Sequence, residues 1–336
     1  STSAGDTITI SGNTATNNGN RGLMASSFGE GTPSPLTTYV NNNVVSNNVG
    51  GIYVYGGSFV VSQNEVTNNT GSNTDGAGIA IYGSYGTSTA TGNLVKGNSG
   101  RWGGGFSARA FSDEEGSGTV TISNNQNIEN TGKRGGAIYS PNSGGTLNIT
   151  NNIMHGNSVS GGSLNGIEPH GAALWLETRT PNLTVTGNSI TGHSGNSLVY
   201  VYCVEGGYQN CTGAYFSYTP IVNSNNLLNN NTTYWLYNNH EDGSDTVDAE
   251  NNWWGTTSDV EMQAKTFDWN DDASKGLADY TPLLTAPNTT APPSPPTNVA
   301  AQTGPTTISL AWSANPESDI SGYKVHYDTD AAGYPY

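Results

Sequence analysis

One pattern of apolar and polar positions recurs nine times along the chain. Each copy opens with alternating apolar residues, such as Leu147 and Ile149 or Leu183 and Val185. This alternation predicts a β-strand with both apolar side chains on one face. An Asn follows five positions after the start of every copy, and successive copies begin 21 to 37 residues apart. A repeat of this length is typical of a solenoid, in which each copy stacks on the next.

The recurring Asn predicts a ladder of amide side chains inside the solenoid. Stacking brings equivalent Asn side chains within about 4.8 Å of one another, the spacing of neighbouring strands. Asn also tolerates the left-handed backbone conformation, so we place it where the chain turns. The seventh position returns an apolar residue to the interior, and in the last copy this residue is Trp253. The tenth position is Asn in seven copies and His193 or Thr256 in the other two. The predicted ladder consists of Asn13, Asn43, Asn64, Asn93, Asn125, Asn152, Asn188, Asn225 and Asn251.

A second apolar stretch follows most copies and begins with small residues. Examples are GGAIYS from Gly135 and GAALWLE from Gly171. Each copy therefore carries at least two short strands separated by Asn or Gly turns. We predict an all-β fold in which residues 1–285 form a parallel β-helix of about nine or more coils, roughly 40 Å long. The alternative, a series of β-sandwiches, needs antiparallel hairpins, which the fixed position of the Asn disfavours.

Aromatic residues alternate with aliphatic residues in these second strands. If the aliphatic side chains face the interior, the rings face outward and stacking aligns them along one sheet. We expect an exposed row made of Tyr53, Tyr55, Tyr82, Tyr139, Trp175, Tyr200, Tyr202, Trp235 and Tyr237. Such a row has three interpretations: it stacks on sugar rings, it packs against another protein molecule, or loops of the same chain cover it.

These features give the chain a family resemblance. It resembles the right-handed parallel β-helix repeat proteins in its Asn-rich coils and in the ending NNWWGT, Asn251–Thr256. The resemblance covers about residues 5–285. Such proteins are common among secreted and surface proteins, and they include lyases, hydrolases, adhesins and structural proteins. The resemblance therefore implies the fold and leaves the function open.

The composition changes after residue 285. Residues 286–297 are rich in Pro and Thr, which predicts an extended linker. Residues 298–336 resemble the first three strands of a fibronectin type III module, with Ile308, Leu310 and Trp312 alternating in the second strand and residues 322–327 matching the third. A complete module needs about ninety residues. We expect that more sequence follows or that a neighbouring molecule completes the module, which would give filaments or oligomers.

The chain is acidic and poor in charged residues. It has 10 Lys and Arg against 26 Asp and Glu, a formal net charge of −16, and only 11% charged residues. This charge disfavours binding to nucleic acid and to anionic membranes, and no apolar run predicts insertion into a membrane. Acidic polysaccharides would also be repelled unless calcium bridged them to the protein.

The two cysteines indicate an oxidising compartment. Cys203 and Cys211 lie eight residues apart in a Gly-containing segment, which favours a disulfide over two free thiols. The sequence starts at Ser1 almost directly in the first copy, so we expect a mature form or a fragment. We therefore predict an extracellular or cell-surface protein.

The resemblance also implies two kinds of enzyme. Lyases on this fold remove a proton from a uronic acid with a Lys or Arg base, often beside calcium, and hydrolases use clustered Asp residues. Paired Asp occurs only at Asp271-Asp272, outside the coils. The residues that a lyase would use could cluster near Glu177, although scattered surface cations are the alternative. These candidates are Arg109, Lys133, Arg134 and His170, with Arg101 and Arg179 nearby in sequence.

A calcium site is a further candidate near the end of the solenoid. Asp268, Asn270, Asp272 and Asp279 have the oxygen spacing of a calcium loop, but Ala273 replaces the central Gly. The alternative is a solvated acidic turn. Taken together, the sequence favours a non-catalytic adhesive or structural protein without a required cofactor, whose partners are polysaccharide or other copies of itself. The alternative is a polysaccharide lyase or glycoside hydrolase with an accessory fibronectin-like module.

Overall fold

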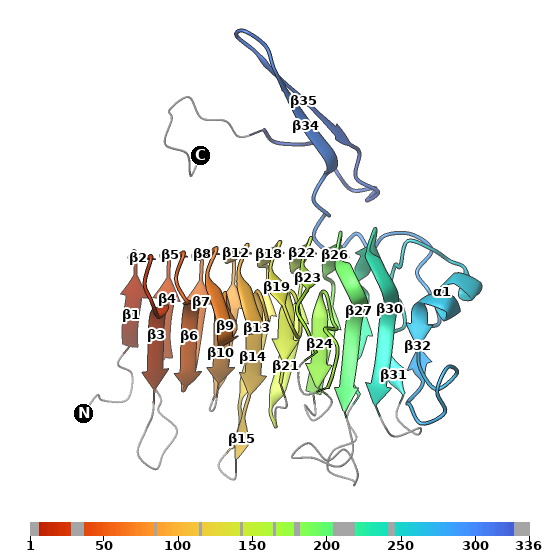
Figure 1. The fold of residues 1–336 in the computed structure, drawn as a ribbon, viewed down its shortest axis with the longest axis horizontal. Helices are drawn as coiled ribbons and strands as arrows, with labels where there is room; N and C mark the ends of the chain where they lie inside the picture. The colour runs from red at the N-terminus through yellow and green to blue at the C-terminus, as the bar shows by residue number, and fades with distance from the viewer. Residues whose placement is uncertain are drawn as a thin grey trace.

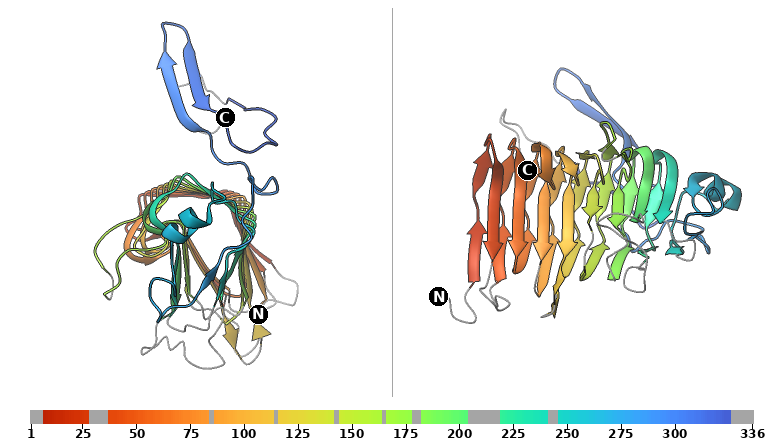
Figure 2. Two further views of the ribbon diagram at one scale, coloured as in Figure 1. Left: turned by 90° about the vertical axis from the view of Figure 1, so that its right-hand side faces the viewer. Right: turned by 60° about the horizontal axis from the view of Figure 1, so that its bottom comes forward.

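A computed structural model describes residues 7–27, 37–83, 86–113, 116–141, 144–163, 166–177, 182–203, 219–240 and 246–325. The coils stack into a rod, and a hairpin near the C-terminus projects away from it (Figure 1). Viewed along the rod, the strands superpose into flat faces joined by corners (Figure 2). No helix in the described residues is long and apolar enough to cross a membrane.

Three parallel sheets form the faces of the rod. The 10-stranded sheet consists of β1 (Thr7–Ser11), β4 (Thr37–Asn41), β7 (Ser58–Ser62), β11 (Thr87–Thr91), β17 (Thr119–Ser123), β21 (Thr146–Thr150), β25 (Asn182–Thr186), β28 (Ile221–Asn223), β31 (Val247–Asp248) and β33 (Ala278–Asp279). The 8-stranded sheet consists of β2 (Thr14–Thr16), β5 (Val44–Ser46), β8 (Glu65–Thr67), β12 (Leu94–Lys96), β18 (Gln126–Ile128), β22 (Ile153–His155), β26 (Ser189–Thr191) and β29 (Asn226–Leu228).

The 13-stranded sheet covers the remaining sides of the rod. Its main run is β3 (Arg21–Ser27), β6 (Gly50–Gly56), β10 (Ile79–Gly83), β14 (Phe106–Ala110), β20 (Ile138–Ser140), β24 (Leu174–Glu177), β27 (Ser194–Cys203), β30 (Asn231–His240) and β32 (Thr266–Phe267). A shorter run joins it at β27 and consists of β9 (Thr70–Asp75), β13 (Ser99–Trp102), β19 (Thr131–Gly132) and β23 (Ser158–Val159). Each strand pairs in parallel with its counterpart in the next coil, as Val120 pairs with Leu147 and Leu147 with Leu183. The predicted parallel β-helix is therefore confirmed, and the sandwich alternative is wrong.

The core fills the rod from end to end with stacked aliphatic side chains. Val120, Leu147 and Val185 belong to one continuous buried cluster with residues of the other two sheets. The strands alternate buried and half-buried positions, so Thr, Ser and Asn face outward on the 10-stranded sheet. This alternation is the pattern from which the strands were predicted.

The Asn ladder is present, with one correction at its end. Each amide nitrogen donates to the side-chain oxygen of the next Asn at 2.9 to 3.0 Å, from Asn13 to Asn225. The last acceptor is Asn252, so the prediction of Asn251 is wrong by one position. The same shift places Trp254 in the core, with 1% of its surface exposed, and leaves Trp253 half-buried outside it.

The turn beside the ladder also differs from the expectation. The left-handed residue is the one before each ladder Asn, such as Asn151 before Asn152 or Asn251 before Asn252. From Asn43 to Asn252 the ladder Asn is buried and its amide joins neighbouring coils, while the preceding Gly, Asn, Gln or Ser makes the turn.

A second amide ladder follows the tenth position of the pattern. It joins Asn18, Asn48, Asn69, Asn98, Asn130 and Asn157 through side-chain hydrogen bonds of 2.9 to 3.0 Å. His193 occupies the next place in the ladder and is fully buried. Its Nδ1 lies 3.2 Å from the carbonyl oxygen of Asn157, and its Nε2 lies 3.1 Å from that of Met154. The ring therefore takes over contacts that an Asn amide makes in the other coils.

The C-terminal part of the described chain closes one end of the rod and then leaves it. Helix α1 (Asp259–Lys265) is capped by Ser258, whose hydroxyl accepts from the Glu261 N–H, and it buries Met262 against the last coils. The predicted linker packs on the rod: the backbone N–H of Asn288 donates to the side-chain oxygen of Asn226 at 2.7 Å, and Ala291 is buried.

Beyond the linker the structure describes a two-stranded hairpin, where the sequence predicts a fibronectin type III module. Strands β34 (Thr297–Thr303) and β35 (Ile308–Ser313) are antiparallel, and Trp312 packs edge-on against Tyr323. Residues 322–325 of the predicted third strand are not in a strand, and residues 326–336 lie outside the described ranges. Ile308 and Leu310 are 68% and 41% exposed, so this part of the hairpin is open to solvent. A fibronectin type III module thus stays a prediction. A separate short hairpin joins β15 (Ser112–Asp113) to β16 (Gly116–Ser117).

Candidate functional site

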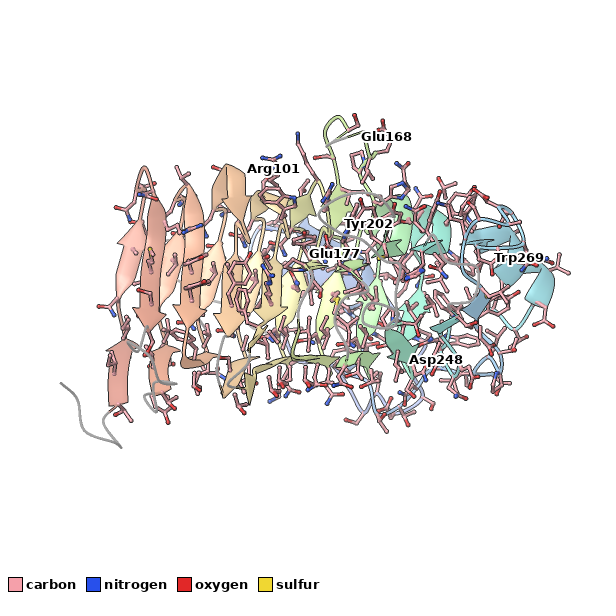
Figure 3. The ribbon with its side chains drawn as sticks, turned by 90° about the horizontal axis from the view of Figure 1, so that it is seen from below. Arg101, Glu168, Glu177, Tyr202, Asp248 and Trp269 are labelled. Carbon is pink, nitrogen blue, oxygen red and sulfur yellow. The ribbon has the colours of Figure 1, made fainter. Side chains whose placement is uncertain are left out.

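The outward side of the main run of the 13-stranded sheet carries most of the unusual side chains. Its outward positions align in register across the coils. One column comprises Tyr53, Ala80, Ser107, Tyr139, Trp175, Tyr200, Tyr237 and Phe267. A neighbouring column contains Tyr55, Tyr82 and Arg109, and further along it Glu177 pairs with Tyr202. Figure 3 shows Glu177 and Tyr202 side by side, with Arg101 nearer the first coils and Trp269 at the capped end.

Most of the predicted aromatic row faces away from the core but is not exposed. Tyr139, Trp175, Tyr200 and Tyr202 form a buried cluster separate from the interior one, joined by Trp102, Ile167 and Tyr237. The prediction that these nine residues are exposed is therefore wrong, because five are buried and four are half-buried. The side chains that cover the sheet come from the same chain.

Trp235 is a second correction to the row. It packs against the interior cluster and stacks on Trp254, with ring centres 6.3 Å apart and planes 10° from parallel. Tyr237 remains in the outward column and stacks on Phe267 at 4.3 Å. Alternation along β30 thus changes near Trp235, which the sequence pattern alone did not indicate.

The arginines of this sheet lie over its aromatic rings. The guanidinium carbon of Arg21 is 3.8 Å from the ring centre of Tyr53, and that of Arg109 is 4.3 Å from Phe111. Arg134 lies 4.8 Å from the ring of Trp175 and is only 7% exposed. Cations stacked on rings are attracted by the negative ring face, so they hold this outer layer in place.

Tyr139 and Glu177 form a buried hydrogen-bonded pair near Arg134. The Tyr139 hydroxyl donates to Oε1 of Glu177 at 2.8 Å, and Glu177 is 1% exposed. Burial, followed by the charge of Glu177 and this hydrogen bond, raises the pKa of Tyr139 well above its usual value. Tyr139 therefore keeps its proton at neutral pH and presents a phenol that donates.

His170 borders the same cluster as a neutral ring. It stacks on Tyr200 with ring centres 4.3 Å apart, and its Nδ1 lies 3.1 Å from the Ser197 hydroxyl. Burial lowers the pKa of His170 to about 4. The imidazole is thus uncharged at neutral pH and has a nitrogen lone pair available for hydrogen bonding.

A pocket of about 170 Å³ opens beside this cluster. Tyr82, Trp102, Arg109, Tyr139 and Pro141 line it. The outward column nearby carries only Ala80 and Ser107 between Tyr53 and Tyr139, so large rings surround a place where the sheet has small side chains. Nε1 of Trp102 and Nε of Arg109 are buried without a hydrogen-bond partner among the described residues. Two residues of the pocket wall thus carry a buried donor without a described partner.

A family model for the right-handed β-helix region matches residues 1–190, more than half of the chain. The chain belongs to the right-handed β-helix family. No curated protein and no solved structure matches it. Membership adds the handedness of the coil to the parallel sheets described above, and it assigns no reaction.

The β-helix brings some of the lyase candidates together and separates others. Backbone bridges pair Trp102 with Arg134 and Arg134 with His170. Arg134 and Glu177 both act on the hydroxyl of Tyr139, one lowering and one raising its pKa. Arg109 lies at the pocket.

The three other cationic candidates either lie outside the pocket lining or fall outside the described residues. Arg101 stacks on Trp102 at 4.2 Å. Lys133 is half-buried beside Gly161 and does not line the pocket. Arg179 lies outside the described residues.

The candidate calcium ligands serve separate turns of the β-helix. Asp268 is 3% exposed and accepts from the N–H groups of Asn270 and Ala278 at 2.9 and 3.0 Å. Asp272 accepts from Ser274, and Asp279 from Thr281. No group of three or more His, Cys, Asp or Glu that could hold a metal occurs among the described residues, which include all four candidates. These carboxylates accept hydrogen bonds within local turns, and calcium binding stays a prediction.

The predicted disulfide is only half described. Cys203 is buried at the end of β27 and is not a free thiol. Cys211 lies outside the described residues, so the pairing stays a prediction.

The sequence argument missed Trp102 and the role of the residue before the second strand. Trp102, Arg134 and His170 each precede a glycine with positive φ, namely Gly103, Gly135 and Gly171. The backbone bridges place these three residues in one column. The sequence signal for this column is a bulky residue directly before three of the Gly-rich starts, at Gly103, Gly135 and Gly171.

Proposed function

We propose that this β-helix is an extracellular or cell-surface protein that binds a polysaccharide on the outer face of the 13-stranded sheet. The observation that carries the proposal is the pocket lined by Tyr82, Trp102, Arg109, Tyr139 and Pro141. Aromatic rings, a cation and two unsatisfied donors meet there. A sugar ring is complementary to this wall, because its apolar C–H faces stack on aromatic rings and its hydroxyl oxygens accept hydrogen bonds.

The surroundings of the pocket support a chain of sugars rather than a single one. Half-buried rings of Tyr53 and Tyr55 continue toward the first coils, with Arg21 stacked on Tyr53. Exposed parts of these rings lie along the rod axis and offer further stacking positions. Arg109 lines the pocket and Arg134 stacks on Trp175 in the adjoining cluster, so cationic side chains lie near the pocket in an otherwise acidic chain.

Binding to immobilised polysaccharides tests this function. Neutral xylan and mannan and acidic polygalacturonate would be compared by affinity electrophoresis. Trp102→Ala should weaken retention at least tenfold, because it removes a ring and a donor from the pocket wall. Tyr39→Ala is the matched control, since Tyr39 is a half-buried outward ring on the 10-stranded sheet. The proposal fails if no polysaccharide retards the protein or if both variants bind as the parent does.

A second candidate function is cleavage of the bound chain. The observation that favours it is the hydrogen bond from Tyr139, which lines the pocket, to buried Glu177, beside neutral His170 and Arg134. Proton transfer beside a carboxylate-bearing sugar requires groups of these kinds, namely a phenol, a carboxylate, a neutral imidazole and a guanidinium.

Product analysis separates cleavage from binding alone. Prolonged incubation with each polysaccharide would be followed by assays for reducing ends and for unsaturated ends. An enzyme should release them, and Tyr139→Phe should abolish release while leaving retention within about threefold, since only the hydroxyl is removed. Absence of both kinds of end with a retained polysaccharide would assign the protein to binding and not to catalysis.

A further inference from the structure

A second pocket, on a different face of the molecule, lies between the rod and the C-terminal segment. Its volume is about 310 Å³. The rod contributes Thr191, Leu228, Trp253 and Gly255, and the C-terminal segment contributes Pro295 and Pro316 among others. Pockets of this size at the junction of two parts of a chain are common ligand sites.

The repeat explains why this pocket forms at the end of the 8-stranded sheet. With the ladder ending at Asn252, Trp253 takes the outward place that Ser189 and Asn226 hold in the two preceding coils. Gly255 is the counterpart of Thr191 and Leu228 and has no side chain. A Cβ built there would lie 3.5 Å from Cβ of Leu228, and Gly255 has a positive φ of 83°. The missing side chain leaves space beside the Trp253 ring.

One residue of the pocket wall, Trp253, and one residue next to the wall, Glu317, carry a buried polar atom without a described partner. Nε1 of Trp253 is buried without a hydrogen-bond partner among the described residues. Glu317 is 5% exposed; its Oε1 accepts from the Ser294 N–H at 2.7 Å, while its Oε2 is buried without a described partner. Ser294 lines the pocket, and Glu317 follows Pro316, which lines it as well. Buried polar groups are normally satisfied, so the unpaired donor of Trp253, a residue of the pocket wall, supports a ligand with hydroxyl groups.

We propose that this junction pocket binds one unit of a neutral sugar chain. The apolar face of a pyranose ring fits against Trp253 and the two prolines, and a ring hydroxyl accepts from Trp253 Nε1. No Lys or Arg lines the pocket, so an anionic sugar has no countercharge there. The site is independent of the face proposed above, because the two pockets share no residue.

Occupancy of the junction pocket would also hold the hairpin to the rod. Its wall combines coil residues such as Leu228 with residues beyond the linker such as Pro316. A ligand that contacts both sides stabilises their docked arrangement by its binding free energy.

The test follows the indole N–H signals of the full chain by ¹H–¹⁵N NMR, with Trp253→Phe assigning the Trp253 signal. Cellopentaose and mannopentaose are the neutral probes, trigalacturonate the anionic probe and tetralysine the cationic probe. We expect one neutral probe to shift the Trp253 signal saturably, and Trp253→Phe to weaken its affinity at least tenfold by calorimetry. Trp269→Phe is the matched control, because Trp269 is 45% exposed and lies outside the pocket lining.

Several results would overturn the proposal. These are an unchanged Trp253 signal with both neutral probes, a response confined to trigalacturonate or tetralysine, or equal affinity of Trp253→Phe and the parent protein. Unchanged signals of the other indoles in Trp253→Phe verify that the variant is folded. Because Trp102 and Tyr139 are untouched, retention on polysaccharide through the 13-stranded sheet can succeed or fail separately.

Discussion

Two kinds of stacked side chains join the coils of this β-helix, and they differ in uniformity. The amide ladders inside the corners repeat one residue type with one geometry from coil to coil. The outer layer of the 13-stranded sheet changes residue at every coil, from Ser107 to Tyr139 to Trp175. Uniform stacks keep neighbouring coils in register and stabilise the rod. The irregular stack has gaps, charges and unpaired donors, which are features of a binding surface.

The outer layer should nevertheless contribute strongly to stability, and this gives the largest expected effect. Trp175 is 0% exposed and contacts Tyr139, Tyr200 and Arg134. Trp175→Ala should lower the free energy of unfolding by about 3–5 kcal/mol, because it leaves a cavity. Urea unfolding measures this change, with Trp269→Ala expected to cost less than about 0.5 kcal/mol. Equal losses for the two variants would mean that the outer layer is not packed as described.

Breaking a ladder should cost somewhat less. In Asn152→Leu, the backbone N–H and amide of Asn125 and the carbonyl of Ile122 lose their partner inside the rod. The expected loss is about 2–4 kcal/mol. Asn148→Leu is the control, since half-buried Asn148 faces outward and only accepts from Thr184. A similar melting shift for both variants would contradict the inward assignment.

The single His in a ladder makes stability depend on pH. Burial lowers the pKa of His193 and of His170 to about 4, whereas an unfolded His titrates near 6.5. Between pH 6.5 and 4 the unfolded chain binds these protons and the folded chain does not, so stability falls as the pH falls. The full effect is up to about 3 kcal/mol for each His.

His193→Asn separates this effect from the titration of carboxylates. The variant restores an amide beside Asn157 and Asn230 and should lose less stability than the parent between pH 7 and pH 4.5. Urea unfolding at several pH values measures the difference. Parallel pH profiles for parent and variant would show that His193 is not titrated on unfolding in this range.

The tail provides the smallest expected effect. Removing residues 298–336 should change the stability of the rod by less than about 0.5 kcal/mol, since this deletion removes the exposed hairpin and spares the linker contacts. Removing residues 286–336 should cost about 1–2 kcal/mol, because Asn226 loses its bonds with Asn288 at 2.7 and 3.0 Å. Thermal unfolding of both forms is the measurement. An identical melting temperature would mean that the linker does not dock.

The interior of the rod was predictable because the apolar and Asn positions recur once in every coil, and this recurrence fixes which side chains face inward. The pattern gave the wrong ladder residue in the last coil, where Asn251 and Asn252 are adjacent. Asn251 has the left-handed φ of the turn, so Asn252 is the residue that enters the ladder. The outward direction of Tyr139 and Trp175 also followed from alternation. Their burial did not, because the covering residues lie outside these strands: Trp102 ends β13 of the shorter run, and Arg134 follows β19.

Each coil of the ladder bonds only to the coils beside it, which has a consequence for the length of the molecule. Asn64 donates to Asn93, and its oxygen accepts from Asn43, so every rung offers the same donor and acceptor to whichever rung adjoins it. A duplicated coil inserted between two others would therefore meet matching partners on both sides. Gene duplication of single repeats can lengthen or shorten such a rod without redesigning its interior, while the irregular outer face diverges coil by coil.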